Sequence, residues 1–323
     1  MILILTTKYY EQGTTPVVDW LIYNRTPYII IHYEDLVSKS NRYVLDLINK
    51  DIIVDGVSVK SRIKVVFYRR FFLSSKIFNY NDDDAIAKQL HLECLSELES
   101  IANYLRHFFI DIPQFPIKQT YGENKLLYLE YALQVGLQCP KSLITNNKDD
   151  VLKFYRDCEN IVSKPIYYSN NYYINEVTYS VRTIKYTEEM IENLSDFFFP
   201  TLFQEAINSI YEIRSFFLDG KFYSTAAIFM EKNKNIDIKL NYRSTNLNWV
   251  SFKLPLIIEE KLDLFMRKMN LNTGSIDLLR TNDDFIFLEV NPVGQYSAPS
   301  DYCNYYLEYE ISEYLRDKLN IPI

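Results

Sequence analysis

The sequence contains few glycines, cysteines and histidines for its 323 residues. Its seven glycines are scattered, whereas phosphate-binding loops of the Rossmann and P-loop types need several of them close together, so we exclude both classes. The four cysteines form no Cys-x-x-Cys pair, and with three histidines the sequence gives no sign of a zinc site or of a disulfide framework. This cysteine usage indicates a protein of the reducing cytoplasm.

Long apolar runs and an excess of basic residues are also missing. No stretch reaches the length of a membrane-spanning helix, and the N-terminal MILIL segment lacks both the basic region and the length of a signal peptide. The net charge of -7 offers no general attraction for nucleic acid or for an anionic membrane. We expect neither partner, and any phosphate chemistry must depend on a local group of basic residues.

The sequence is rich in apolar and aromatic side chains: 48% of its residues are hydrophobic, with 28 tyrosines and 20 phenylalanines. A chain of this size buries a large core and is expected to fold as two or three coupled units. Prolines in the segment IPQFPIK punctuate the chain near residue 118, and Pro200 marks a second expected boundary. We therefore predict units at 1–118, 119–200 and 201–323.

The first unit has the pattern of an α/β domain. MILILTT and PYIIIHY read as strands on either side of a helix, TPVVDWLIYN, and KVVFYRR reads as a further strand. Asp55-Gly56 suits a tight hairpin turn. A long amphipathic helix is predicted between residues 84 and 110, because apolar residues recur there at steps of three and four: Ile86, Leu90, Cys94, Leu98, Ile101, Leu105 and Phe109.

The other two units mix helices with hairpins and have α+β character. In the central unit ENKLLYLEYALQVGL, NKDDVLKFYRD and TEEMIENLSDFF read as helices, KSLIT and IVSKPIYY read as strands, and Pro200 is expected to close the segment at a hinge. In the third unit we predict hairpins over Asp219-Gly220 and over residues 282–284. An amphipathic helix, NYYLEYEISEYLRDKL, follows them.

The segment FIFLEVN places Glu289 and Asn291 in an apolar strand, where an unpaired carboxylate is costly to bury. Residues two apart share a face, and folding the hairpin brings Asp277 close to opposite Glu289, within one residue of register. Carboxylate and amide oxygens are ligands of hard cations, and Mg²⁺ binds few protein oxygens while keeping others for substrate phosphates. The alternative is that Glu289 faces solvent on an edge strand and Asn291-Pro292 merely starts a turn.

Residues 119–296 resemble the ATP-grasp superfamily of carboxylate-amine and carboxylate-hydroxyl ligases, through motifs that occur in order. The resemblance implies an ATP-grasp fold, with an N-terminal pre-ATP-grasp α/β domain and two α+β subdomains that clamp the nucleotide. The motifs that carry it are NKLLYLEYALQVGLQCP, IVSKP, TLFQEAI, EIRSFFLDGKFYSTA, NYRSTN, GSIDLL and FLEVNP.

The resemblance assigns a role to each candidate residue. It implies phosphate contacts for Lys125 and Lys164, contacts of Arg214 and Arg243 with phosphate or an acyl intermediate, an adenine and ribose site at Gln204, Glu205, Ala206 and Ile207, and Mg²⁺ ligation by Asp277, Glu289 and Asn291. Some of these roles have a simpler alternative. In that case Lys125 would be a solvated surface lysine, Arg214 would only pair with Glu212 or Glu205, and Lys239 would take the role assigned to Arg243. The family's glycine-bearing loop after the second lysine is here YYSNNYY.

The whole chain is similar in particular to the peptide maturases that make graspetides, of the grasp-with-spasm type, which are relatives of the microviridin ligases. KVVFYRRF, NKLLYLEYALQVGLQCPKSLIT, GSIDLLRTNDDFIFLEVNPVGQY and CNYYLEYEI carry this resemblance. It implies that ATP phosphorylates an Asp or Glu of a precursor peptide with leader and core segments, and that a Ser, Thr or Lys of the same peptide closes an ester or amide ring. A homodimer is also implied. Arg69 and Arg70 either end a strand or serve a substrate or domain interface.

Two other functions stay open from the sequence. One is an ATP-grasp ligase that adds an amino acid to a protein tail or to a small carboxylate. The other is a non-catalytic sensor of nucleotide or peptide on the same fold, although a sensor needs no complete set of magnesium ligands. The mass of the product separates the two ligases, because ring closure removes water whereas ligation adds a residue.

Overall fold

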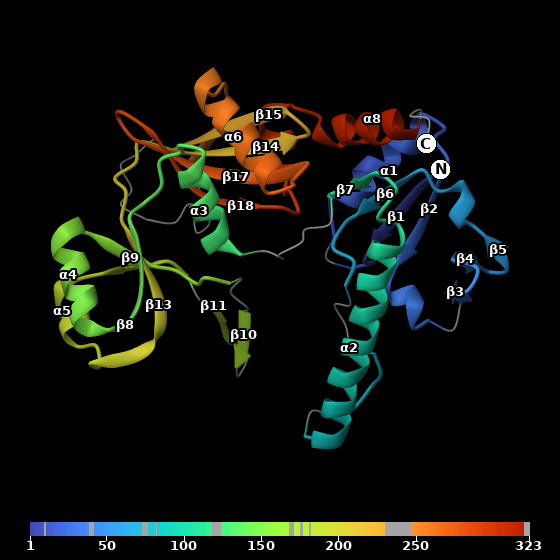
Figure 1. Cartoon of the computed structure of the whole chain (residues 1–323), viewed down its shortest axis with the longest axis horizontal. Helices are drawn as coiled ribbons and strands as arrows, with labels where there is room; N and C mark the ends of the chain where they lie inside the picture. The colour runs from blue at the N-terminus through green and yellow to red at the C-terminus, as the bar shows by residue number, and fades with distance from the viewer. Residues whose placement is uncertain are drawn as a thin grey trace. The chain divides into compact units, whose positions relative to one another are not determined.

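The computed structural model describes residues 1–9, 11–38, 42–72, 77–81, 83–117, 124–167, 171–174, 177–180, 182–229 and 247–319. The chain forms two compact units, which we describe separately (Figure 1). The first comprises Met1–Lys118, Gln295–Asp301 and Tyr305–Ile323, and the second comprises Gln119–Gly294 and Tyr302–Asn304. Within the described part of the chain, no helix has the length and hydropathy needed to cross a membrane.

The first unit is built on a parallel four-stranded sheet in the order β2-β1-β6-β7. Two helices at opposite ends of the chain, α1 and α8, contact each other, and Trp20 packs edge-on against Tyr309. Leu3 and Leu5 of β1 share one face of the sheet, and this face packs on α2. The bounds of these elements are β1 Ile2–Thr6, α1 Thr14–Tyr23, β2 Tyr28–His32, β6 Val65–Tyr68, α2 Ala85–Phe108, β7 Gln114–Phe115 and α8 Leu307–Leu319.

A small antiparallel sheet, β3-β4-β5, is inserted before β6. Its tight turn is the predicted one, because Asp55 and Gly56 both have the positive φ that a two-residue hairpin turn requires. Two short 3₁₀ helices flank it. The bounds are η1 Tyr33–Leu36, β3 Tyr43–Asp46, β4 Asp51–Val54, β5 Val57–Ser58 and η2 Lys60–Arg62.

The long helix α2 is confirmed, and Asp84 caps its first turn through hydrogen bonds from the backbone N–H groups of residues 86 and 87. Its predicted buried face is confirmed in the second half for Leu98, Leu105 and Phe109, whereas Ile101 in the same half is 41% exposed. In the first half the expected core residue Ile86 is 82% exposed, because these turns extend beyond the sheet (Figure 1).

The second unit contains two sheets, the first of which has the order β12-β9-β13-β8 and packs against α4 and α5. Pro200 lies inside β13, so our expectation that it closes the segment is wrong. The strand tolerates it because the β13–β8 register shifts between Phe197 and Thr201. The bounds are β8 Ser142–Asn147, α4 Lys148–Cys158, β9 Ile161–Ser163, β12 Ile184–Tyr186, α5 Glu188–Glu192 and β13 Phe197–Glu205, and a separate hairpin joins β10 Asn171–Ile174 to β11 Val177–Ser180.

The second sheet of this unit is antiparallel, in the order β16-β15-β14-β17-β18. Both predicted hairpins are present, and α3 and α6 pack on one face of the sheet around Ile213, Ile276, Leu278, Phe287 and Val290. The other face is therefore available for polar residues. The bounds are α3 Lys125–Gln134, β14 Tyr211–Leu218, β15 Lys221–Phe229, β16 Leu247–Phe252, α6 Leu256–Lys268, β17 Thr273–Arg280, β18 Phe285–Asn291 and, after the sheet, α7 Ser297–Cys303.

Candidate active site

The β17–β18 hairpin brings the predicted metal ligands onto one face of the five-stranded sheet. Asp277 is directly opposite Glu289, and Asn291 is opposite Ser275. The register shifts by one residue between Asp277 and Leu278, so two residues of β18 face one residue of β17. In an unbroken ladder Leu288 would oppose Asp277 and Glu289 would turn to the apolar face. The bulge therefore decides which side of the sheet carries the Glu289 carboxylate.

Asp277 is held by Arg214, its cross-strand neighbour on β14. The Arg214 guanidinium donates from Nε to Oδ1 at 2.8 Å and from Nη2 to Oδ2 at 3.0 Å. Both residues are buried, and such a two-bond pair fixes the plane of each group as well as its position. Arg214 thus pairs with Asp277. The sequence suggests only Glu212 and Glu205 as its possible partners.

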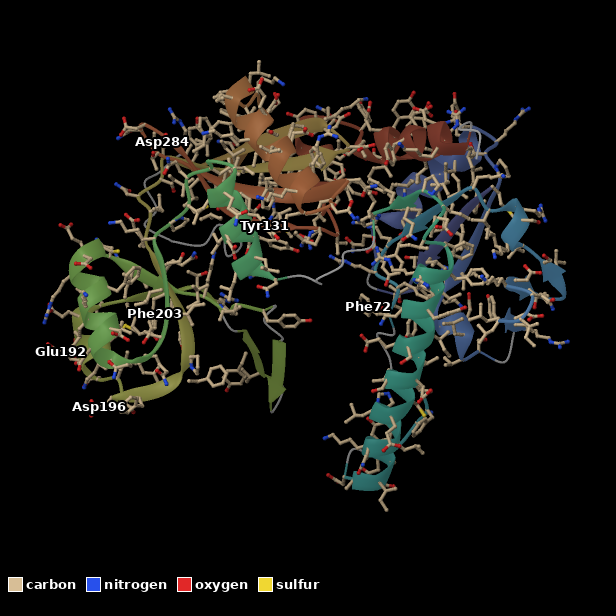
Figure 2. All side chains as sticks on the ribbon, viewed as in Figure 1. Phe72, Tyr131, Glu192, Asp196, Phe203 and Asp284 are labelled. Atoms are coloured by element: carbon tan, nitrogen blue, oxygen red, sulfur yellow. The ribbon has the colours of Figure 1, made fainter. Side chains whose placement is uncertain are left out.

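Glu289 is paired with Lys125, at the first turn of α3. The distance from Lys125 Nζ to Glu289 Oε2 is 3.2 Å, and the two side chains are 23% and 20% exposed. The side chain of Asn124 caps this helix by accepting from the backbone N–H groups of Leu126 and Leu127. The cap fixes the start of α3, and with it the position of Lys125. Figure 2 shows α3, marked by Tyr131, and the turn of the β17–β18 hairpin, marked by Asp284. Lys125 is therefore partly buried and paired, and its assignment to phosphate stays a prediction.

Asn291 ends β18, and its side-chain oxygen accepts from the backbone N–H of Val293 at 3.1 Å. Its cross-strand partner Ser275 is 1% exposed, and the Ser275 hydroxyl has no hydrogen-bond partner among the described atoms. Our sequence analysis missed Ser275. The signal was its position two residues before Asp277, which puts both side chains on the same face of β17.

Lys164 follows β9 and lies near Cys139, which precedes α4 in the chain. Burial raises the pKa of the Cys139 thiol to about 11, and the positive charge of Lys164 acts in the opposite direction. The residue before Cys139 joins the second sheet, since the Gln138 carbonyl accepts from Phe287 N at 2.7 Å. This contact links the segment that carries Cys139 to the strand that carries Glu289.

The predicted adenine segment lies at the end of β13 and in the connection to β14. The Gln204 side chain is buried and donates to Ser142 Oγ at 2.8 Å, so its amide is engaged within the sheet. Glu205 N donates to Lys141 O and Ala206 N to Asn160 O, both at 2.9 Å. Ile207 lies beyond the strand and is partly buried. Arg243, the second predicted arginine, and Lys239 lie outside the described residues.

The donor set around Asp277 fits a hard cation. Two carboxylates and one amide oxygen come from adjacent strands, and the buried hydroxyl of Ser275, opposite Asn291, has no hydrogen-bond partner among the described atoms. Among the described residues there is no group of three or more His, Cys, Asp and Glu side chains that would hold a metal by themselves. This composition suits Mg²⁺, which is commonly held by one or two carboxylates and completed by water and substrate phosphates, rather than Zn²⁺.

Solved structures with the same fold are ATP-grasp ligases. The macrocyclase MdnC from Microcystis aeruginosa MRC, bound with the precursor peptide MdnA, is 24% identical, covers 98% of this chain and 99% of its own, and superposes with a TM-score of 0.80. A RiPP-associated ATP-grasp ligase of Chryseobacterium gregarium, in complex with ADP and a leader and core peptide, is 20% identical, covers 99% and 97%, and has a TM-score of 0.80.

A third similar structure is the ATP-grasp ligase PsnB complexed with a phosphomimetic variant of a minimal precursor, Mg and ADP. It is 14% identical, covers 98% of both chains and has a TM-score of 0.77. No protein-family model and no curated protein matches the sequence. The chain therefore has the ATP-grasp fold, and the predicted fold class is confirmed.

Proposed function

We propose that the chain is an ATP-dependent ligase that closes side-chain ester or amide rings in a ribosomally made precursor peptide. The observation that carries the proposal is the pairing of Asp277 with Glu289 on one sheet face, beside the cations Arg214 and Lys125, in an ATP-grasp fold. Such a group of charges offsets the repulsion between a nucleotide triphosphate and an anionic substrate.

The proposed roles follow the sequence assignments. Bound Mg²⁺ would supply positive charge between the phosphates, and Asp277, Glu289 and Asn291 would hold it. Lys125 contacts Glu289, so it would lie beside the phosphates that share this Mg²⁺. Arg214 keeps the Asp277 carboxylate in one orientation. The other assignments are a phosphate contact for Lys164, contacts of Arg214 and Arg243 with phosphate or the acyl intermediate, and an adenine and ribose site at Gln204, Glu205, Ala206 and Ile207.

The proposed reaction has two steps. The terminal phosphoryl group of ATP passes to an Asp or Glu side chain of the peptide, which gives an acyl phosphate and ADP. A Ser or Thr hydroxyl, or a Lys amine, of the same peptide then attacks the acyl carbon. The bond from that carbon to the phosphate oxygen breaks, the nucleophile loses its proton, and phosphate leaves.

A peptide substrate is supported by the structures of similar fold, since MdnC is bound with a precursor peptide and the Chryseobacterium ligase with leader and core peptides.

We also infer that the segments 119–200 and 201–323 clamp the nucleotide through the two sheets of the second unit, although 201–323 contributes α8 to the first unit. A homodimer and a cytoplasmic location are part of the proposal, and light scattering checks the former.

The test is incubation of the purified protein with Mg²⁺, ATP and a precursor peptide, followed by mass spectrometry. A suitable precursor is the product of a short reading frame next to the gene that ends in repeated Thr and Glu or Asp. The proposal expects the loss of one water for each ADP released. A gain of residue mass indicates an amino-acid ligase, and nucleotide binding without turnover indicates a sensor; either result contradicts the proposal.

A further inference from the structure

The parallel sheet of the first unit has a topological switch point between β1 and β6. The chain leaves β1 through α1 towards β2 on one side, and leaves β6 through α2 towards β7 on the other side. In open α/β sheets ligands bind in the crevice that such diverging connections leave outside the carboxyl ends of the strands. The loops that follow β1 and β6 therefore flank this crevice.

Glu11, from the loop after β1, is shared by two arginines that follow β6. Glu11 Oε1 accepts from Arg69 Nε at 3.0 Å and from Gly13 N at 2.7 Å, while Glu11 Oε2 lies 3.5 Å from Arg70 Nε. The Glu11 side chain is 2% exposed. One buried carboxylate thus faces two guanidinium groups.

The two arginines differ in their surroundings. Arg69 is buried, lies over the ring of Tyr296, and leaves no room for a Cβ at Gly13, since its Nη2 would be 2.7 Å away. The Tyr296 hydroxyl donates to the Gly13 carbonyl, so Tyr296, Gly13, Glu11 and Arg69 hold one another in place. The Arg70 side chain is instead 30% exposed and meets Glu11 only through its Nε edge among the contacts described. Its Nη groups are further N–H donors.

Arg70 also has an unusual backbone. Its φ is +48°, in the left-handed region that side chains other than glycine rarely adopt. Backbone strain of this kind persists where the surrounding structure fixes it, and it concentrates at ligand-binding sites. Here the strain places an arginine at the end of β6 where glycine fits more easily.

The neighbouring side of β1 carries its own charges. Lys8 pairs with Asp35, and the buried Glu34 accepts from the Thr7 hydroxyl and from Lys8 N. His32 contacts the same Asp35 through Nδ1. These acids are already paired or hydrogen-bonded with groups that follow β1 or belong to β2.

We propose that this crevice is a second anion site, in which Arg70 binds a carboxylate of the peptide substrate and the Glu11–Arg69–Tyr296 group holds Arg70 in place. A guanidinium recognises a planar carboxylate through two parallel hydrogen bonds, and Arg70 has the exposure and the charge to do so. The inference deepens the proposed function by assigning a substrate-recognition residue outside the nucleotide-binding unit.

The test compares the Arg70→Gly and Arg25→Gly variants. Both arginines lie in the first unit with a left-handed backbone, and Arg25 belongs to the turn after α1, so each substitution relieves the same strain. The probe is a fluorescent synthetic peptide of alternating threonine and glutamate, with a glutamine counterpart. We expect Arg70→Gly to unfold at the wild-type temperature or above it, yet to weaken binding of the glutamate peptide by at least about tenfold.

The Arg25→Gly variant should bind the glutamate peptide like the wild type. The affinity of Arg70→Lys for this peptide should lie between those of the wild type and Arg70→Gly, because lysine keeps the positive charge but cannot donate two parallel hydrogen bonds. Equal binding of the two peptides by the wild type, or unchanged binding by Arg70→Gly, overturns the inference. Competition by inorganic phosphate without a preference for glutamate assigns the site to phosphate and also overturns it. Calorimetry of Mg²⁺-dependent ATP binding on the same samples reports separately on the proposed function.

Discussion

Arg214 and Asp277 face each other on neighbouring strands and form two hydrogen bonds in a buried position. Each residue neutralises the other, so removing one charge leaves the other buried and uncompensated. The Asp277→Asn variant should therefore lose about 3–5 kcal/mol of unfolding free energy, measured by urea denaturation. The double variant Arg214→Met, Asp277→Leu should recover most of that loss, since it buries neither charge. An additive double variant would show that the pair contributes no coupling.

Glu289 should matter for the cation but little for folding, because its side chain is 20% exposed and its partner Lys125 reaches solvent. We expect Glu289→Gln to change the unfolding free energy by less than about 1 kcal/mol and to abolish ring closure and Mg²⁺-dependent ATP binding. Calorimetry and mass spectrometry measure the two losses.

The matched control for this prediction is Glu130→Gln, on the exposed side of α3, where Glu130 accepts from Gln134. It should retain both activities. If Glu289→Gln still forms product at the wild-type rate, the assignment of Glu289 as a metal ligand is wrong.

The sequence predicted the members of the site better than their partners. Motif resemblance and alternation placed Asp277, Glu289 and Asn291 on one hairpin, but the register was left open by one residue. A signal for the bulge was present, because the core residues of β18 are Phe287 and Val290, three apart where strict alternation requires two. The ion pairs depend on contacts between strands and helices far apart in sequence, which periodicity cannot give.

The errors in the fold have a similar origin. Apolar spacing identified α2, but spacing gives the face of a helix and not how far the sheet beneath it reaches, so Ile86 was wrongly placed in the core. Pro200 read as a boundary because proline removes a backbone donor. A register shift in β13 accommodates that missing donor, and this compensation lies in the pairing with β8 rather than in the local sequence.

Gly294, after the β18 turn, has a φ of +67° and closely approaches the sheet. A Cβ at this position would lie 2.9 Å from Phe216 Cε2 and 3.0 Å from Thr273 Oγ1, both of which belong to buried residues. Gly294→Ala combines backbone strain with overpacking and should lower the unfolding free energy by about 1–3 kcal/mol. Gly56→Ala, with open space around its Cβ, carries the backbone strain alone and should cost less in the same urea experiment.

Tyr33 links the stability of the first unit to alkaline pH. Burial, and to a lesser extent the negative charges of Glu99 and Tyr68, raise the pKa of Tyr33 from 10.0 to about 12. The unfolded chain therefore loses this proton more readily than the folded chain, so the stabilisation is complete below about pH 10 and is lost as the pH rises towards about 12. Tyr33→Phe keeps the edge-on contact with Phe71 and removes the ionisable group, and it should flatten the fall in unfolding free energy between about pH 10 and pH 12. Tyr9→Phe, at an exposed position of the same unit, should leave that slope unchanged, and an equal slope in the wild type and Tyr33→Phe would place the alkaline transition elsewhere.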